Sequence, residues 1–174
     1  KALKLAGNRV ISVLAGRSKE LIILEEQVRE YSDEVIIMTD DGSYGQKGLV
    51  TAGMEQVILR EKIDKCFAIG PAIMMKFCCL LTKKYEIPTE VSLNTIMVDG
   101  TGMCGACRIT VGGKTKFVCI DGPEFNGHQV DFDEMFKRMG AFKAVELEEM
   151  EHLDEHLSPT YTDAIKHMEH LIDV

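Results

Sequence analysis

The feature that most constrains this chain is a short run of cysteines near its middle. Cys104 and Cys107 are separated by two residues, and Cys119 follows after eleven more. Four residues also separate an aspartate from the first of these cysteines. The pattern D-x4-C-x2-C-x11-C matches the C-x4-C-x2-C…C spacing of plant-type [2Fe–2S] proteins, with aspartate in the first ligand position. The sequence therefore predicts an electron-carrying iron–sulfur site with the ligands Asp99, Cys104, Cys107 and Cys119.

Glycines alternate with the proposed ligands. Gly100, Gly102 and Gly105 all lie between Asp99 and Cys107. A loop that wraps a metal cluster needs tight turns, and residues without a Cβ adopt them at low steric cost. Such a loop also directs backbone N–H groups toward negatively charged sulfur, and these hydrogen bonds help to set a cluster's reduction potential. The glycine pattern therefore favours a cluster-binding loop.

Two other interpretations of the same residues stay open. The C-x2-C pair and the third thiol could hold a structural zinc ion, with Asp99 or His128 as the fourth ligand. Asp-Gly is also a strong turn signal, so Asp99 could shape the loop without binding metal. The spacing alone does not choose between these roles.

The composition excludes several classes of partner. The 174 residues carry a net charge of −8, whereas nucleic-acid binding needs a basic face for phosphate contacts. Every apolar run is shorter than the roughly 20 residues of a membrane span, and the first residues do not resemble a signal peptide. Cys66, Cys78 and Cys79 lie in apolar stretches that are typical of buried free thiols. We therefore expect a protein of the reducing cytoplasm that binds neither nucleic acid nor membrane.

Strand-like and helix-like segments alternate over residues 9–95. The predicted strands are 9–15, 34–38, 64–69 and 89–93, and the predicted helices are 19–31, 49–60 and 72–85. Helices of this length between short apolar strands imply right-handed crossovers and a parallel sheet. The sequence thus predicts an α/β fold with an open parallel sheet and flanking helices.

Three loops lie where such a sheet binds its ligand, beyond the carboxyl ends of the strands. The helices that follow them offer free N–H groups and the positive end of the helix dipole, which suit a phosphate. Arg17 adds a permanent cation that could grip a phosphate or simply lie on the surface. We expect nucleotide contacts from Gly16, Arg17, Ser18, Asp40, Asp41, Gly42, Gly70 and Pro71.

The pattern changes after residue 95. Alternating runs at 108–111 and 115–118 flank a Gly-Gly pair, which predicts a tight hairpin. This hairpin would bring Cys107 and Cys119 to the same edge. Cys119 is therefore the credible last ligand.

Helical patterns dominate the rest of the chain. They cover 131–139, 144–157 and 160–172. The tail has four histidines, which we interpret as part of polar helix surfaces rather than a metal site: His152, His156, His167 and His170. We expect three units, namely an NAD(P)-binding domain (1–95), a small β-rich [2Fe–2S] domain (96–140) and an acidic helical tail (141–174).

Four stretches of the chain resemble one family closely: GRSKELIILEEQ, TDDGSYGQKG, AIGPAIMMK and VDGTGMCGACRITVGGKTKFVCIDGPEF. They are similar to the small, ferredoxin–NADP reductase-like subunit of NADH-dependent reduced ferredoxin:NADP oxidoreductase. Related subunits serve sulfide dehydrogenases, dihydroorotate dehydrogenases and cytosolic hydrogenases. The resemblance covers about residues 1–155 and is most specific over 98–125.

The resemblance implies a flavin domain, then a nucleotide-binding domain, then a small [2Fe–2S] domain. The dihydroorotate dehydrogenase branch has four cysteines, whereas the ferredoxin:NADP branch resembles this chain in having an aspartate at the position of Asp99. By this resemblance Asp99 is a cluster ligand. The resemblance also implies that Gly70 and Pro71 border the nicotinamide end of the nucleotide, and that Arg17 and Ser18 lie near the adenosine ribose phosphate.

Two features of that family would precede Lys1. Residues 1–6 already have the pattern of a helix end, with Gly7-Asn8 as the C-terminal cap. The flavin-binding barrel and the first strand of the nucleotide domain, with its glycine-rich loop, would come before this helix. We therefore expect a fragment of a longer protein that holds FAD only at full length.

Together these observations predict an electron-transfer subunit of an NAD(P)H-dependent iron–sulfur flavoprotein. Hydride from NAD(P)H would reduce the flavin, and the cluster would relay single electrons to a larger catalytic subunit in a hetero-oligomer. One alternative is a zinc-stapled nucleotide-binding or regulatory module without a redox role. Another is an assembly subunit that keeps the cluster and docks through its acidic tail. Arg17 favours NADP over NAD only weakly.

Overall fold

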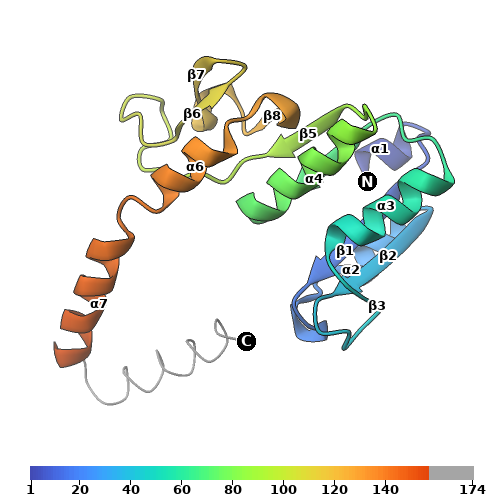
Figure 1. The fold of residues 1–174 in the computed structure, drawn as a ribbon, viewed down its shortest axis with the longest axis horizontal. Coiled ribbons are helices and arrows are strands. Elements are labelled where there is room, and N and C mark those ends of the chain that lie inside the picture. Colours follow the sequence, from blue (N-terminus) through green and yellow to red (C-terminus); the bar gives the residue numbers. More distant parts are fainter. Residues whose placement is uncertain (157–174) are drawn as a thin grey trace.

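The computed structural model describes residues 1–156, with side chains through Met150. The fold consists of two three-stranded sheets and a separate two-stranded hairpin, with helices beside them (Figure 1). The strands are β1 (Ile11–Gly16), β2 (Glu34–Thr39), β3 (Gln46–Lys47), β4 (Cys66–Ile69), β5 (Thr89–Ser92), β6 (Arg108–Val111), β7 (Lys114–Phe117) and β8 (Glu124–Asn126). The α-helices are α1 (Ala2–Leu5), α2 (Glu25–Glu30), α3 (Val50–Arg60), α4 (Ala72–Lys84), α5 (Val118–Asp121), α6 (Phe132–Met139) and α7 (Lys143–His156). Two short 3-10 turns are η1 (Lys19–Leu21) and η2 (Gly127–Gln129).

The first sheet is parallel, as predicted. β1 and β2 pair along their full length, and the short β3 continues the sheet beside the end of β2. α3 packs against this sheet, and Ile36, Met38 and Val57 form a small core between them. Helical crossovers between parallel strands therefore organise this part of the chain, as expected from the alternation of patterns.

The helix predicted over 19–31 is wrong in its middle. The chain makes the single turn η1, becomes extended at Ile22, and forms α2 only after Leu24, whose φ of 58° is left-handed. The Cδ1 atom of Ile22 lies so close to Gly16 that a Cβ there would be 3.2 Å away from it. This contact with the end of β1 fixes the segment in an extended form, and it outweighs the helical spacing of the apolar residues.

The second sheet joins the two halves of the chain. β4 and β5 are parallel, and β8 pairs with β5 in the opposite direction, with Val91 opposite Phe125. The sequence did not predict β8 because three residues are too few for a recognisable alternating pattern. One buried core runs through this sheet, α4, the hairpin and α6, and its members include Ala68, Met75, Val91, Ile109, Val118, Phe125 and Met135.

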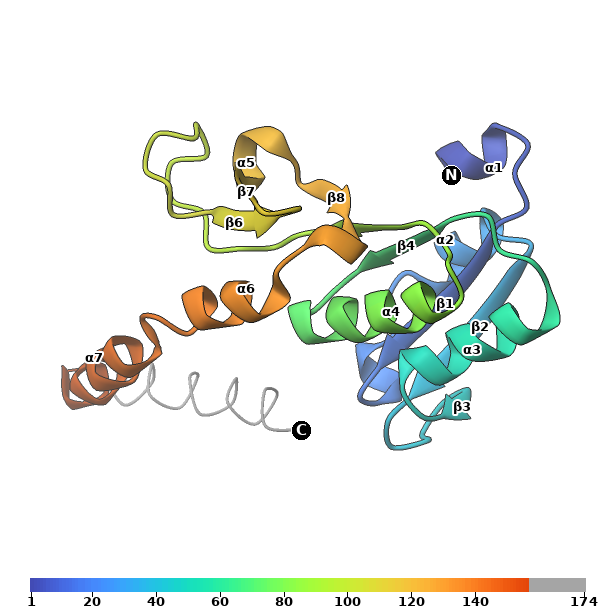
Figure 2. The same ribbon diagram turned by 45° about the horizontal axis from the view of Figure 1, so that its top comes forward.

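The predicted hairpin is present. β6 and β7 are antiparallel, and the glycines between them have the φ values of 58° and 74° that a two-residue type I′ turn requires. β7 ends at Phe117, one residue earlier than predicted, and the single turn α5 follows it. Figure 2 shows the hairpin and α5 beside the long loop that precedes β6.

Two helices complete the described chain. Asp131 is the N-cap of α6, and its carboxylate accepts a hydrogen bond of 2.9 Å from the backbone N–H of Glu134. α7 covers nearly the predicted 144–157. Within residues 1–156, no helix is long and apolar enough to cross a membrane. The helix predicted over 160–172 and all four tail histidine side chains lie outside the part that the structure describes.

Candidate iron–sulfur site

The loop between β5 and β6 carries Asp99 and Cys104. The Asp99 carboxylate accepts hydrogen bonds of 2.8 Å from the backbone N–H groups of Thr101 and Cys104. The bond from Thr101, together with that from Cys104, holds the pKa of Asp99 below its ordinary value. Asp99 therefore forms the predicted Asp-Gly turn, and it keeps an ionised carboxylate beside Cys104.

Positive φ angles shape this loop. Gly100, Gly102 and Gly105 have φ values of 71°, 81° and 67°, which residues with a Cβ rarely adopt. At Gly102 a Cβ would also lie 2.6 Å from the Cδ1 atom of Ile120 in α5. Glycine therefore lets the loop turn and approach α5 closely.

Cys107 and Cys119 lie together. Cys107 directly precedes β6, Cys119 lies in α5 after β7, and their Sγ atoms are 3.2 Å apart. The expectation that the hairpin brings these two thiols to one edge is therefore confirmed. Burial raises the pKa of Cys107, but hydrogen bonds from the backbone of Cys119 and Val118 outweigh it, and the net pKa is lowered. The pKa of Cys119 is raised because its thiol shares a hydrogen bond with Cys107.

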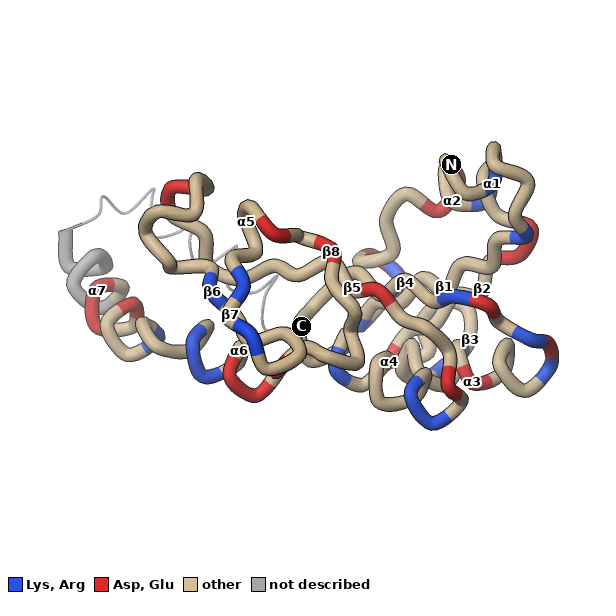
Figure 3. Tube along the Cα trace, turned by 90° about the horizontal axis from the view of Figure 1, so that it is seen from above, with Lys and Arg blue, Asp and Glu red and all other residues tan. Residues whose placement is uncertain are grey.

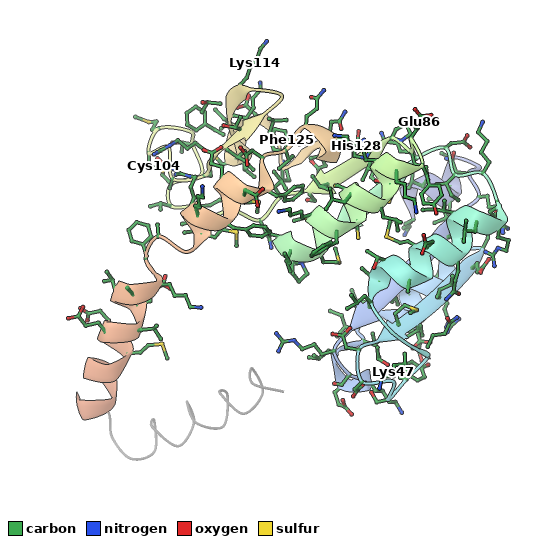
Figure 4. The ribbon with its side chains drawn as sticks, viewed as in Figure 1. Lys47, Glu86, Cys104, Lys114, Phe125 and His128 are labelled. Carbon is green, nitrogen blue, oxygen red and sulfur yellow. The ribbon has the colours of Figure 1, made fainter. Side chains whose placement is uncertain are left out.

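Cys104 lies at the exposed end of the same loop (Figure 4). Its Sγ accepts a hydrogen bond of 3.4 Å from the N–H of Ala106. Among the residues that the structure describes, no three His, Cys, Asp or Glu side chains are gathered as metal ligands, and all six cysteines are free. The donor set is nevertheless suited to a [2Fe–2S] cluster, because soft thiolates with backbone N–H groups directed at sulfur are what such clusters use.

His128 does not join these cysteines. Its Nε2 is 3.0 Å from Oγ1 of Thr82 in α4, and Figure 4 places it on a different segment from Cys104. Burial, with a smaller effect from the nearby Lys83, lowers the pKa of His128, so the ring is neutral at neutral pH. The zinc interpretation with His128 as fourth ligand is therefore wrong in this structure, and His128 instead attaches η2 to α4.

The residues predicted to contact nucleotide lie at the carboxyl ends of β1, β2 and β4. The N–H of Asp40 bonds to the carbonyl of Gly16 at 3.2 Å, and the N–H of Asp41 bonds to the carbonyl of Arg17 at 3.1 Å. The structure thus brings two of the three loops together, with Ser18 and Gly42 beside these pairs in the chain. Gly70 and Pro71 follow β4 of the second sheet, at the turn into α4.

The sequence analysis did not predict the roles of two arginines that contact the loop between β5 and β6. Arg108 donates to the carbonyl of Gly105 at 3.2 Å, and Arg138 donates to the carbonyl of Ala106 at 3.1 Å. Arg138 lies 32 residues from its partner. A bond from a side chain to a distant backbone carbonyl has no characteristic sequence spacing, so the sequence could not predict it. An arginine in the last turn of a helix is also common, because its charge interacts favourably with the helix dipole.

Residues 94–131 match the family described as the iron–sulfur cluster binding domain of dihydroorotate dehydrogenase B. The loop, the hairpin and α5 all lie within this match. The fold and the site therefore place this part of the chain in the class of iron–sulfur domains of oxidoreductases.

Longer relatives extend the similarity over most of the chain. An electron transfer subunit homologue of dihydroorotate dehydrogenase B (NAD(+)) from Thermotoga maritima is 53% identical over 146 residues, which are 84% of this chain and 51% of that protein. A probable electron transfer subunit of the same enzyme from Methanocaldococcus jannaschii is 37% identical, over 79% of this chain and 51% of that protein. A solved structure of the NADH-dependent reduced ferredoxin-NADP oxidoreductase, reported for flavin-based electron bifurcation, matches with a TM-score of 0.77 and 49% identity, over 87% of this chain and 55% of that one.

The chain is a homologue of the electron transfer subunits of dihydroorotate dehydrogenase B, and it is similar to a chain of the solved NADH-dependent reduced ferredoxin-NADP oxidoreductase. It has their α/β fold with parallel sheets and an iron–sulfur domain. It spans about half the length of the curated relatives that it matches.

Proposed function

We propose that this chain relays electrons through a [2Fe–2S] cluster, as part of an electron-transfer subunit of a flavin-dependent NAD(P)H oxidoreductase. The observation that carries the proposal is the approach of Cys107 and Cys119, with Sγ atoms 3.2 Å apart, inside the segment that matches an iron–sulfur domain. A [2Fe–2S] cluster supplies one-electron transfer when bound. The protein supplies the ligands, the hydrogen bonds to sulfur and the surrounding charge, which set the potential.

The proposed ligand set combines two structural parts. The loop before β6 supplies Asp99 and Cys104, while Cys107 and Cys119 come from the two ends of the hairpin. Asp99 lies on the same loop as Cys104 and accepts a hydrogen bond of 2.8 Å from its N–H, which supports the assignment of Asp99 as the one oxygen ligand. The unit that holds the cluster is proposed to span residues 96–140.

The nucleotide side of the proposal rests on residues 1–95. We propose that NAD(P) contacts the loops after β1, β2 and β4, because phosphate-binding loops lie at the carboxyl ends of parallel strands. FAD is proposed to bind only in a longer protein, and the electrons to pass to a larger catalytic subunit, in keeping with the name electron transfer subunit that the relatives carry. Six unpaired thiols support a reducing, cytoplasmic setting.

The direct test is metal and sulfide analysis of the chain purified without oxygen. We expect about two irons and about two acid-labile sulfides per chain, the content of one [2Fe–2S] cluster, and a red-brown colour. Zinc at about one per chain without sulfide would replace the proposal with a zinc-stapled module, because zinc favours the same C-x2-C pair.

Replacing Asp99 with cysteine tests the oxygen ligand. We expect Asp99→Cys to keep about two irons per chain, because the plant-type pattern has cysteine at this position. The midpoint potential and the visible absorption should both shift, since a carboxylate and a thiolate donate to iron differently. Redox titration with optical detection measures both. An unchanged potential and spectrum would remove Asp99 from the ligand set.

A further inference from the structure

The ligand loop, which runs between β5 and β6 and carries Asp99, Cys104 and Cys107, is held by hydrogen bonds to its backbone. Besides the turn at Asp99, its cysteine end is held by Arg108, whose backbone N–H and guanidinium both donate to the carbonyl of Gly105, at 3.3 Å and 3.2 Å. The N–H of Val118 also donates to the carbonyl of Cys107 at 3.2 Å, and the N–H of Ala106 makes a weak bond to Sγ of Cys104. Beside the loop lies a cavity of about 390 Å³, and its lining includes Thr95, Ala106, Arg108 and Arg138. The hydroxyl of Thr95 is buried there and has no hydrogen-bond partner. The shape of the stretch beside this cavity therefore depends in part on the hydrogen bonds that side chains donate to its backbone.

The side chain of Arg138 extends from α6 to the backbone of the ligand loop. Its guanidinium donates to the carbonyl of Ala106, the peptide that leads directly into Cys107, at 3.1 Å. The side chain is half-buried rather than free in solvent. Figure 3 shows basic segments at β6, β7 and the end of α6, with an acidic segment at the start of α6 among them. A fixed positive charge therefore lies one peptide away from a proposed ligand.

The helix that carries Arg138 is itself firmly held. Phe132 and Met135 are buried in the main core, and the Glu134 carboxylate accepts a bond of 3.0 Å from the N–H of Thr110 in β6. Asp133 forms an ion pair of 2.6 Å with Lys76 in α4. These contacts tie α6 to both the hairpin and the second sheet. Arg138 is thus a rigidly mounted group, which is what a positioning residue requires.

We propose that Arg138 is a positioning residue for the cluster, with two effects. It holds the Cys104–Cys107 loop in its ligating shape through the carbonyl of Ala106. Its charge also stabilises the reduced cluster, which has one more negative charge than the oxidised form, and so raises the midpoint potential. This inference rests on the proposed [2Fe–2S] function, and it assigns a role to a residue outside the ligand motif.

The test compares Arg138→Gln with Lys137→Gln in the full chain. Both remove one positive charge from the last turn of α6, but Lys137 is exposed, so it is the matched control. We expect Arg138→Gln to weaken the preference for the reduced state about tenfold, which is a potential lower by about 59 mV for one electron. It should also lose iron faster to a chelator.

Each outcome has a distinct meaning. Lys137→Gln should have the same midpoint potential and the same rate of iron loss as the unmodified chain. Arg138→Lys keeps the positive charge but not the planar guanidinium, so it should retain most of the midpoint potential but less of the resistance to the chelator. Equal potentials and equal chelator rates in the two glutamine variants would overturn the role of Arg138. A lower chelator resistance with an unchanged potential would overturn its electrostatic effect. An unmodified chain without iron and sulfide would instead remove the proposed function itself.

Discussion

Replacing Cys107 with alanine is expected to abolish cluster binding. Cys107 is 2% exposed, and its thiol faces Cys119 at 3.2 Å, so no other side chain can take its place without moving the hairpin. Loss of one thiolate leaves iron with an incomplete ligand shell. Iron and sulfide per chain should fall at least tenfold after purification without oxygen, and the visible absorption should disappear.

Cys66 provides the matched control. It is also a free cysteine, half-buried where Cys107 is buried, and burial in β4 raises the pKa of its thiol to about 11, so it remains protonated and inert. Cys66→Ala should therefore keep the full iron and sulfide content and lose only some thermal stability. If Cys107→Ala kept about two irons per chain, Cys107 would be removed from the ligand set. If both variants lost the cluster equally, the loss would reflect unfolding rather than ligation.

The sequence correctly predicted the parts of the fold whose conformation depends on residues close together in the chain. The Gly-Gly turn between two alternating runs determines the hairpin, because φ values of 58° and 74° are accessible to glycine and strained for other residues. The same argument predicted the helix end before β1, where the N–H of Asn8 bonds to the carbonyl of Leu3. The meeting of Cys107 and Cys119 followed directly from the hairpin.

Long-range contacts determine the parts that sequence did not predict. Ile22 has helical neighbours but is extended because Gly16, in another element, leaves room for its side chain. β8 exists because Phe125 is buried opposite Val91, which lies 34 residues earlier in the chain. Arg138 donates to a backbone carbonyl, and because every residue has one, the sequence does not indicate which carbonyl it bonds to. In each case the partner is chosen by packing, and sequence spacing contains no information about it.

A single methyl group at Gly127 is expected to destabilise the junction between the two halves of the chain. Gly127 is buried in η2, where a Cβ would lie 2.4 Å from Sγ of Cys79 in α4 and 2.9 Å from Cγ1 of Val91 in β5. Cys79 and Val91 are 4% and 1% exposed, so neither can move aside into solvent. Overpacking of this kind costs about 1–3 kcal/mol. Gly127→Ala should therefore lower Tm by about 2–4 °C for each kcal/mol lost.

Two companion variants separate overpacking from other effects of the methyl group. At Gly140, φ is −86° and the nearest atom to an added Cβ is at an ordinary 3.5 Å, so Gly140→Ala should leave stability unchanged or raise it slightly. Cys79→Ala removes the atom that clashes, so the double variant with Gly127→Ala should be more stable than the two single losses added together. Strictly additive losses in denaturant unfolding would mean that the methyl group and Cys79 do not meet. The attachment of η2 to α4 would then depend on the bond between His128 and Thr82 rather than on close packing at Gly127.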